Sequence, residues 1–281
     1  MSAPLNFWLI LDLSNTSDCW SRRPGHPGRT YMTECRRRFR MDLSYDGTAY
    51  AGWQVQPGRA TIQLIVEDAI RRVLQERVRL HASGRTDAGV HARQQVAHLD
   101  LRELSMPTVR LMGALNAILP ADIRVMGITE AAPDFHARLS ATAKEYRYYL
   151  WRGCILPPFL CRYRWHIPHE LDIPRMQRAA EYLVGRHDFA SFSANPNRPV
   201  RDTRRHLQLL LVRKKGSTIE IAARADGFLY KMMRSLVGFL VRVGEGRIAP
   251  SAARDILRAK RRTAMVPTAP AQGLFLWKVF Y

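Results

Sequence analysis

One carboxylate, Asp87, stands in a short segment framed by two glycines, Gly84 and Gly89. Glycine permits backbone conformations that other residues rarely adopt, so this segment is predicted to form a tight loop, called here the glycine loop. Arg85 and Arg93 lie nearby in the sequence, and positive charge beside a carboxylate favours its ionised form. An ionised carboxylate can act as a nucleophile on a sugar or a base without a cofactor. The ordinary alternative is that Asp87 caps a turn or pairs with Arg85.

Two histidines, His81 and His91, flank the loop and raise the question of a metal site. Their spacing fits no common pattern of metal ligands, and such histidines are more often structural. The loop also lacks the Lys-Ser or Lys-Thr pair of a phosphate-binding loop, and no serine stands in the G-x-S-x-G pattern of a nucleophilic elbow. We therefore expect neither a metal ion nor a cofactor.

The net charge indicates the kind of partner. The chain has 281 residues, with 44 Lys and Arg against 24 Asp and Glu, and its formal net charge is +20. Such an excess favours a polyanionic partner, and nucleic acid is the first candidate. An acidic membrane surface is the competitor. The sequence shows no basic amphipathic helix with an aromatic apolar face and no apolar run long enough to span a bilayer, so we expect nucleic acid and no membrane.

The cysteines and the N-terminal segment bear on the compartment. The four cysteines form no C-x-x-C pair and no zinc-ligand grouping with histidine: Cys19, Cys35, Cys154 and Cys161. The apolar run 5–13 is short, contains Asp12 and has no Lys or Arg before it, which makes it a poor signal peptide. A cytoplasmic protein with free thiols is the simplest interpretation.

Hydrophobic periodicity predicts the elements that position Asp87. Residues 1–35 lack periodicity and are predicted to be a poorly ordered extension, with Met32 just before the regular pattern begins. Up to residue 140, the predicted elements are strand 37–45, helix 61–75, strand 78–83, the glycine loop, strand 95–101, helix 107–119 and strand 123–129.

A connector at 134–141 is predicted to lead into a second half, which opens with an aromatic strand at 142–152. Alternation places Tyr146 and Tyr148 on one face of that strand and Tyr149 on the other. Such rings ordinarily fill a core, but an aromatic beside basic residues can stack a flipped base. The further predicted elements are helix 172–184, strands 205–213 and 218–225, helix 229–243, helix 251–262 and strand 274–281.

These elements predict an α+β fold. Two similar halves, 36–140 and 141–281, share a sheet flanked by helices, with an active-site cleft between the halves.

The run Gly84-Arg85-Thr86-Asp87-Ala88-Gly89-Val90-His91 resembles the signature of the tRNA pseudouridine synthase A family. Other motifs are similar to the family's landmarks, in the same order: Tyr45-Asp46-Gly47-Thr48, Gly52-Trp53-Gln54, Phe135-His136-Ala137-Arg138, Lys144-Glu145-Tyr146-Arg147-Tyr148, Met233-Arg234 with Val237-Gly238, and Gly273-Leu274. The resemblance covers the chain from about residue 37 onward. It implies two α+β halves around a continuous, largely antiparallel sheet, a homodimer, no cofactor, and uridines at positions 38, 39 and 40 of the tRNA anticodon arm as substrate.

The resemblance also implies roles for single residues. Asp87 matches the family's nucleophile, and Arg85 matches the arginine that assists base flipping. Tyr146 matches the substrate-contacting tyrosine, and Arg234 the arginine that pairs with the aspartate. Whether Asp87 attacks C1′, attacks C6 or promotes a glycal route stays open, as does whether Tyr146 is a base or only a stacking platform. The sequence departs from the family in its first 35 residues and at Gln272, where an acidic residue is often found.

Two other functions compete with this interpretation. A non-catalytic RNA-binding protein could use the same basic cleft, although a carboxylate such as Asp87 would repel phosphate there. A metal-dependent RNA hydrolase would need a second carboxylate or histidine that converges on Asp87.

Overall fold

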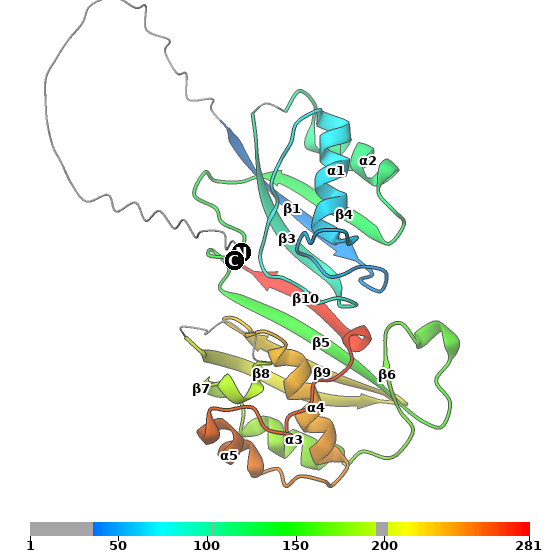
Figure 1. The fold of residues 1–281 in the computed structure, drawn as a ribbon, viewed down its shortest axis with the longest axis vertical. Coiled ribbons are helices and arrows are strands. Elements are labelled where there is room, and N and C mark those ends of the chain that lie inside the picture. Colours follow the sequence, from blue (N-terminus) through cyan, green and yellow to red (C-terminus); the bar gives the residue numbers. More distant parts are fainter. Residues whose placement is uncertain (1–35, 103, 195–201) are drawn as a thin grey trace, which may run out of the picture. The chain divides into compact units, whose positions relative to one another are not determined.

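One ten-stranded sheet runs through the residues that the computed structural model describes, 36–102, 104–194 and 202–281. Its main path has the order β4-β1-β3-β10-β5-β9-β8-β7, while β2 pairs with β3 and β6 pairs with β5 (Figure 1). The strands are β1 (Arg37–Tyr45), β2 (His81–Ala82), β3 (His91–Leu101), β4 (Ile123–Glu130), β5 (Ala143–Arg152), β6 (Trp165–Ile167), β7 (Gly185–Asp188), β8 (Arg204–Lys215), β9 (Thr218–Ala225) and β10 (Leu274–Phe280). Only the β3–β10 and β5–β6 pairs are parallel, so the predicted α+β fold with a largely antiparallel sheet is confirmed.

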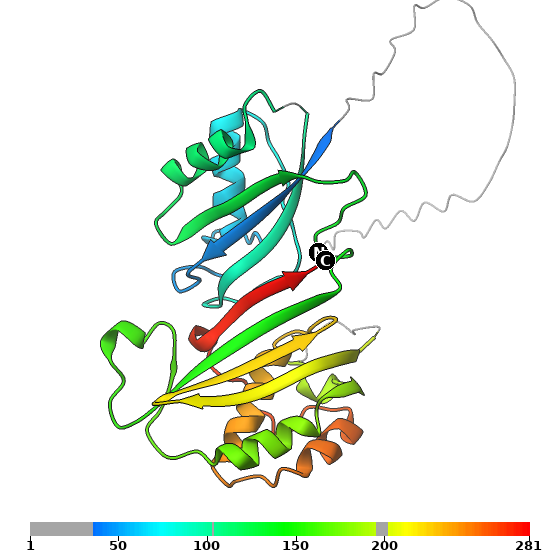
Figure 2. The same ribbon diagram turned by 180° about the vertical axis from the view of Figure 1, so that it is seen from behind.

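The helices of the described residues lie on one face of this sheet. They are α1 (Ile62–Leu74), α2 (Thr108–Ile118), α3 (Ile173–Glu181), α4 (Met232–Gly244) and α5 (Ala252–Ala259), with short 3-10 turns at Pro158–Leu160, Ala190–Phe192 and Ala271–Gly273. From behind, Figure 2 shows the strands in front and the helices beyond them. We call the covered side the helix face, and the other side, which carries Arg93, Arg147, Tyr149, Arg224 and Trp277, the open face.

Alternation along the strands builds the core between the helices and the sheet. Phe39, Met41 and Leu43 point to the helix face and are at most 1% exposed, as expected when side chains alternate along a half-buried strand. The same alternation in β5 buries Tyr146 and Tyr148 on the helix face and leaves Tyr149 on the open face. The predicted division of the three tyrosines is therefore confirmed.

The strand β10 joins the two parts of the sheet. Its residues Phe275 and Leu276 pair in parallel with β3, and its other edge pairs antiparallel with β5. The described residues on both sides of position 140 belong to the same compact unit, so the division at that position stays a prediction. The predicted extension 1–35 lies outside the described residues.

The strand predicted before the glycine loop is shorter than expected, because side chains of α1 form hydrogen bonds with the backbone groups at its start. The amide of Leu80 donates to the Glu67 carboxylate at 2.8 Å, and its carbonyl accepts from Gln63 at 3.2 Å. Ladder pairing is consequently limited to His81 and Ala82. Beyond the loop, β3 begins at His91 rather than at residue 95.

Helix ends in the second half also differ from the prediction. Lys231 has a left-handed backbone (φ 55°), so α4 begins at Met232 rather than at residue 229. Lys260 (φ 47°) ends α5 in the same way. The helix predicted to run to residue 184 is shorter, because α3 ends at Glu181. The chain then forms the short strand β7 from Gly185 (φ 120°), which periodicity alone did not reveal.

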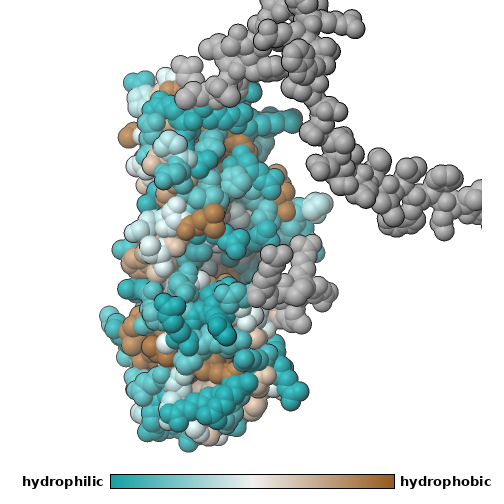
Figure 3. Space-filling view, turned by 90° about the vertical axis from the view of Figure 1, so that its left-hand side faces the viewer, coloured by the Kyte–Doolittle hydropathy of each residue, from teal (hydrophilic) through white to brown (hydrophobic). Residues whose placement is uncertain are grey.

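The surface of the described residues is largely polar on the face that Figure 3 draws, where hydrophobic residues form small separate areas. Within the described ranges, no helix combines the length and apolar composition needed to cross a bilayer. Cys154 and Cys161 are free and exposed, while Cys19 and Cys35 lie outside the described residues.

Candidate active site

The glycine loop connects β2 to β3 and is held against the segment that follows β1. The amide of Trp53 donates to the Thr86 carbonyl at 3.1 Å, and the amide of Gly89 donates to the Tyr50 carbonyl at 3.3 Å. The hydroxyls of Thr86 and Tyr45 bond at 2.8 Å in the core. Backbone and side chains thus both fix the position of the loop.

Two glycines of the neighbouring segment allow this close approach. Gly52 has a φ of +91°, and a Cβ atom on it would lie 2.5 Å from the Thr86 carbonyl oxygen and 3.0 Å from the carbonyl carbon of Asp87. A Cβ on Gly47 would lie 2.0 Å from the Val90 carbonyl oxygen. Any side chain at either position would displace the loop that carries Asp87.

The first residues of the loop are tied to two strands. The Gln95 amide group on β3 donates to the Gly84 carbonyl at 2.8 Å and accepts from the Ser83 hydroxyl at 2.7 Å. The ammonium of Lys144 on β5 donates to the Ser83 carbonyl at 2.5 Å. The loop therefore has little freedom at its entry, and Lys144 is a contact that the sequence did not single out.

Asp87 pairs with an arginine from the second half of the chain. Nη1 of Arg234, in the first turn of α4, donates to its Oδ2 at 2.9 Å, and Nε donates to the Ala269 carbonyl at 2.7 Å. The side chains of Arg234 and Asp87 are 14% and 22% exposed. The predicted pairing with Arg234 is confirmed. The alternative pairing with Arg85 is wrong, since Arg85 is exposed and forms no ion pair or hydrogen bond with the described residues.

Tyr146 stands beside this pair on the helix face of β5. It is 8% exposed, and its ring lies edge to face with Phe228 at a centroid distance of 4.8 Å. Burial, and then the nearby Tyr45 and Asp87, raise the pKa of its hydroxyl. The hydroxyl is therefore a protonated phenol at neutral pH. Its neighbour Tyr148 is buried in the core and donates to the Pro270 carbonyl at 2.8 Å.

Arg93 is not part of the site, and the expectation that it adds charge beside Asp87 is wrong. β3 begins at His91, and a bulge in its pairing with β1 between Leu43 and Tyr45 shifts the alternation of its side chains. Ala92 therefore stands opposite Tyr45 on the helix face, and Arg93 points to the open face. There the Arg93 guanidinium lies over the Trp277 ring at 4.4 Å.

The two histidines that flank the loop have structural contacts. Nδ1 of His91 accepts from the Gly47 amide at 3.1 Å, and its Nε2 lies 3.0 Å from the Arg162 carbonyl and 3.1 Å from that of Gln272. Burial lowers the pKa of His91, partly opposed by the Asp46 carboxylate. His81 stacks on His98 instead, at 4.9 Å. Across the described ranges, no three or more His, Cys, Asp or Glu side chains are grouped to hold a metal ion.

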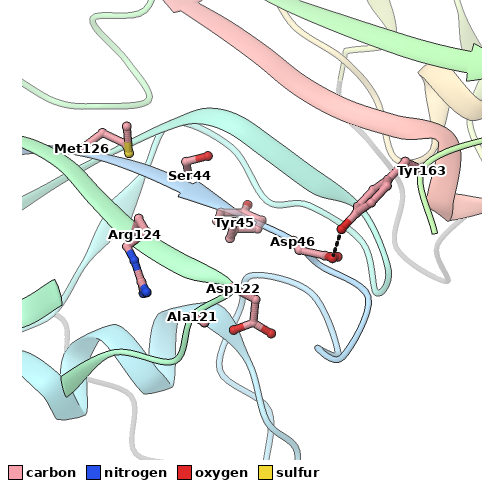
Figure 4. Close-up of a pocket in the computed structure, with 8 residues that line it drawn as sticks. All are labelled: Ser44, Tyr45, Asp46, Ala121, Asp122, Arg124, Met126 and Tyr163. Atoms are coloured by element: carbon pink, nitrogen blue, oxygen red, sulfur yellow. Dashed lines mark hydrogen bonds between the residues drawn. The ribbon is translucent and has the colours of Figure 1, made fainter. Parts of the chain in front are cut away.

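A shallow hollow of about 440 Å³ opens near the end of β1. It is lined by Ser44, Tyr45, Asp46, Ala121, Asp122, Arg124, Met126 and Tyr163. In Figure 4 the Tyr163 hydroxyl points to the Asp46 carboxylate, to which it donates at 2.8 Å. Neither this hollow nor a second one of about 570 Å³ is lined by Asp87, so the predicted cleft at Asp87 stays a prediction.

Comparison with known proteins defines the class. A family model described as tRNA pseudouridine synthase matches residues 43–139 and 179–281. The chain therefore belongs to the tRNA pseudouridine synthase family, whose members are isomerases that convert uridine to pseudouridine in tRNA. The matched ranges include Asp87 and Arg234, whereas Tyr146 and Lys144 lie between them.

Curated relatives define the particular protein that the chain resembles, tRNA pseudouridine synthase A. The protein of that name from Bacillus pumilus is 43% identical over 246 residues, which cover 87% of this chain and 99% of the relative. The one from Moorella thermoacetica is 46% identical over 244 residues, covering 86% and 98%. The one from Shouchella clausii is 46% identical over 245 residues, covering 87% and 93%. The family resemblance found in the sequence is confirmed.

Proposed function

We propose that this chain isomerises uridine to pseudouridine at positions 38, 39 and 40 of the tRNA anticodon stem and loop, with Asp87 as the nucleophile. One observation carries the proposal: in a member of this family, the Asp87 carboxylate is held by Arg234 at 2.9 Å on a loop whose backbone is fixed on both sides. A positioned carboxylate of this kind is what covalent or electrostatic catalysis at a sugar or base requires.

Access to the target base comes first. The reacting atoms of a stacked uridine are out of reach, so the nucleotide must leave its helix. Arg85 is exposed on the same loop and has no partner among the described residues. A free guanidinium beside Asp87 supports the role of entering the RNA stack and holding the nucleotide outside it.

The reaction is balanced within the substrate. The bond from N1 of uracil to C1′ breaks, the base turns, and a bond from C5 to C1′ forms. The C5 proton is then lost and N1 gains one, so no external oxidant or reductant is consumed. Asp87 can serve by attack on C1′, by attack on C6 or by promoting a glycal. Arg234 orients the carboxylate in each case.

Tyr146 fits the stacking role best in its present state. Its ring is fixed by Phe228, and its raised pKa means that the hydroxyl is protonated when the substrate enters. It can accept the C5 proton only after giving up its own.

We also propose that the protein is a homodimer and is located in the cytoplasm. We assign the second copy to the open face, which the described helices leave uncovered. There the Trp277 ring lies between Arg93 at 4.4 Å and Arg147 at 4.1 Å, a rigid aromatic surface suited to protein contact. Sedimentation of wild type and of Trp277→Ser tests this assignment, which predicts a dimer for the first and a monomer for the second.

The activity is tested by carbodiimide mapping of pseudouridine in three anticodon stem-loops, each with a single uridine at position 38, 39 or 40. We expect modification of all three by the wild-type protein and of none by Asp87→Asn. Tight binding of all three without modification would favour the non-catalytic RNA-binding function. Cleavage of the RNA, lost to a chelator, would favour the hydrolase.

A further inference from the structure

Lys144 is a largely buried cation at the entry of the glycine loop. Its ammonium donates to the Ser83 carbonyl at 2.5 Å, and a Cβ on Gly84 would lie 3.4 Å from it. Burial, and then the charges of Arg138 and Arg205, lower its pKa to about 8. No carboxylate is among the groups that shift it. Two other cations thus act on Lys144, and no carboxylate offsets them.

The other two cations come from different elements. Arg205 is on β8, where its Nη1 donates only to backbone carbonyls, those of Asp202 at 3.2 Å and Arg204 at 2.5 Å. A Cβ on Gly227 would lie 3.3 Å from the Nε atom of Arg205, so the guanidinium packs against this segment. The next residue, Phe228, is the one whose ring contacts Tyr146.

Arg138 belongs to the connector between the two halves of the chain. It is exposed, and its side chain has no hydrogen bond or ion pair with the described residues. Arg205 shares the helix face with Lys144, because Leu207, two residues further along β8, stands opposite Ala225 of β9, and Ala225 stands opposite Lys144. The three cations come from three segments, and none of them forms an ion pair with a described carboxylate.

Such a group is costly for the folded chain on its own. A desolvated ammonium loses hydration, and two neighbouring cations repel it. Uncompensated charge of this kind is typical of a site that receives a ligand of opposite sign. A phosphate group supplies that charge and several acceptor oxygens for guanidinium and ammonium donors.

We propose that Lys144, Arg138 and Arg205 bind a backbone phosphate of the RNA beside the flipped nucleotide. The inference rests on the proposed function, because it takes RNA as the ligand. Lys144 and Tyr146 lie two residues apart on one face of β5, which separates them by roughly 7 Å. One nucleotide can span that separation between its base and its phosphate, so the stacking ring and the phosphate site serve the same nucleotide.

A competing explanation for the position of Lys144 is that it only fixes the glycine loop through its hydrogen bond to the Ser83 carbonyl. In that case its removal would weaken binding of every RNA equally, whichever phosphate is charged. A direct contact instead couples the cation to one phosphate, and a double-mutant cycle measures that coupling.

The test uses anticodon stem-loops in which one phosphate at a time is replaced by an uncharged methylphosphonate. Binding is measured in the Asp87→Asn background, so that no turnover occurs, with and without Lys144→Met, Arg138→Gln or Arg205→Gln. Arg258→Gln is the matched control, because Arg258 is an exposed cation on α5 that pairs with Asp255 at 3.4 Å. Arg138→Gln and Arg205→Gln leave the Ser83 contact in place and keep the test valid if Lys144→Met folds poorly.

We expect one phosphate beside the target uridine whose neutralisation weakens binding about tenfold, a typical loss for a single charge-assisted contact. In each of the three variants, the same neutralisation should weaken binding clearly less than tenfold, because one of the three contacts is already lost. In Arg258→Gln it should still weaken binding about tenfold. The salt dependence of binding should also become shallower by about one phosphate contact in each variant. If the binding losses from the variant and from the neutralised phosphate simply add at every phosphate, the proposed phosphate site is wrong. Pseudouridine mapping on the unmodified RNA with the active protein tests the proposed function separately. Additive binding losses together with intact modification would therefore reject the phosphate site alone.

Discussion

The open face of the sheet and the surroundings of the glycine loop both carry many cations, but the two regions differ in whether these cations have partners within the chain. On the open face, arginines meet acids or aromatic rings within the chain. The pairs are Arg38 with Asp100 at 2.7 Å, Arg40 with Asp42 at 2.9 Å, Arg224 with Glu145 at 2.9 Å, and Arg164 over Tyr149 at 4.4 Å. Around the loop, Lys144, Arg138, Arg205 and Arg85 meet no carboxylate among the described residues. A net charge of +20 therefore does not describe one uniform basic surface. Cations that are already paired stabilise the fold and the contacts of the open face, and unpaired ones remain available to RNA.

The largest effect should come from Asp87 itself. Asp87→Asn removes the charge but little volume, so we expect no detectable pseudouridine while tRNA binding stays within about tenfold, about 1.4 kcal/mol. Single-turnover assays and filter binding measure the two quantities. Full turnover by this variant, after mass spectrometry has excluded deamidation, would contradict the nucleophile.

Loss of the arginine that pairs with Asp87 should come next. Arg234→Gln leaves Asp87 without its partner and removes the tie to Ala269, so we expect the single-turnover rate to fall by at least about a hundredfold. The open-face counterpart Arg38→Gln also breaks a part-buried ion pair, with Asp100, but should change the rate by less than about twofold. Equal rate losses in the two variants would show that both ion pairs act only on the stability of the fold and that the pair at the loop has no special role in the reaction.

Tyr146→Phe separates the ring from its hydroxyl. The ring and its contact with Phe228 remain, so tRNA affinity should stay within about threefold of wild type. The single-turnover rate of the same variant then decides the open role. An unchanged rate assigns Tyr146 to stacking alone, and a large loss assigns the hydroxyl to proton transfer. A large loss of affinity would contradict the stacking platform itself.

The charge of Lys144 should make binding depend on pH. Its folded-state pKa, about 8, lies below the ordinary value of 10.5, so its ammonium is lost as pH rises through 8. We expect the tRNA affinity of wild type to fall over that range by several-fold more than the affinity of Lys144→Met. Identical pH profiles for the two proteins would remove Lys144 from the binding surface.

The same pKa has the opposite consequence for folding. Between about pH 8 and 10.5 the unfolded chain binds the Lys144 proton and the folded chain does not, so this group makes the fold more stable as pH rises. The melting temperature of wild type relative to Lys144→Met should therefore increase over that interval. A relative decrease would mean that the folded state favours the ammonium.

The smallest effect should come from the N-terminal residues. A chain that begins at Met32 lacks Arg22, Arg23 and Arg29 but also Asp12 and Asp18, a small net change beside +20. We expect it to melt and to modify tRNA like the full chain, with a slight loss of affinity that shrinks as salt rises. A melting temperature several degrees lower, or loss of most of the rate, would show that residues 1–31 pack on the fold.

Local patterns predicted much of this architecture. Alternation located β1 and β5 and the division of Tyr146 from Tyr149, and two glycines located the loop of Asp87, because these features depend on neighbouring residues. The partner of Asp87 lies in α4, far along the chain, and was indicated only through the family resemblance.

Other features depend on contacts that no local pattern contains. The direction of Arg93 follows from the bulge between β1 and β3, and β7 is too short for periodicity to show. The lack of a counter-ion at Lys144 became visible only when β5, β8 and the connector were brought together. Residue types therefore predicted which charges exist, whereas the fold decides which of them are neutralised.

The central position of β10 has a consequence for biosynthesis. Every other described strand precedes it in the chain, so during translation the edges of β3 and β5 that it joins stay unpaired until β10 has left the ribosome. Unpaired strand edges are prone to mispairing, and late closure of distant contacts slows folding. Asp87 and Tyr146 meanwhile stand on two unjoined partial sheets. A nascent chain without β10 therefore lacks the strand that holds these two parts of the site in one sheet.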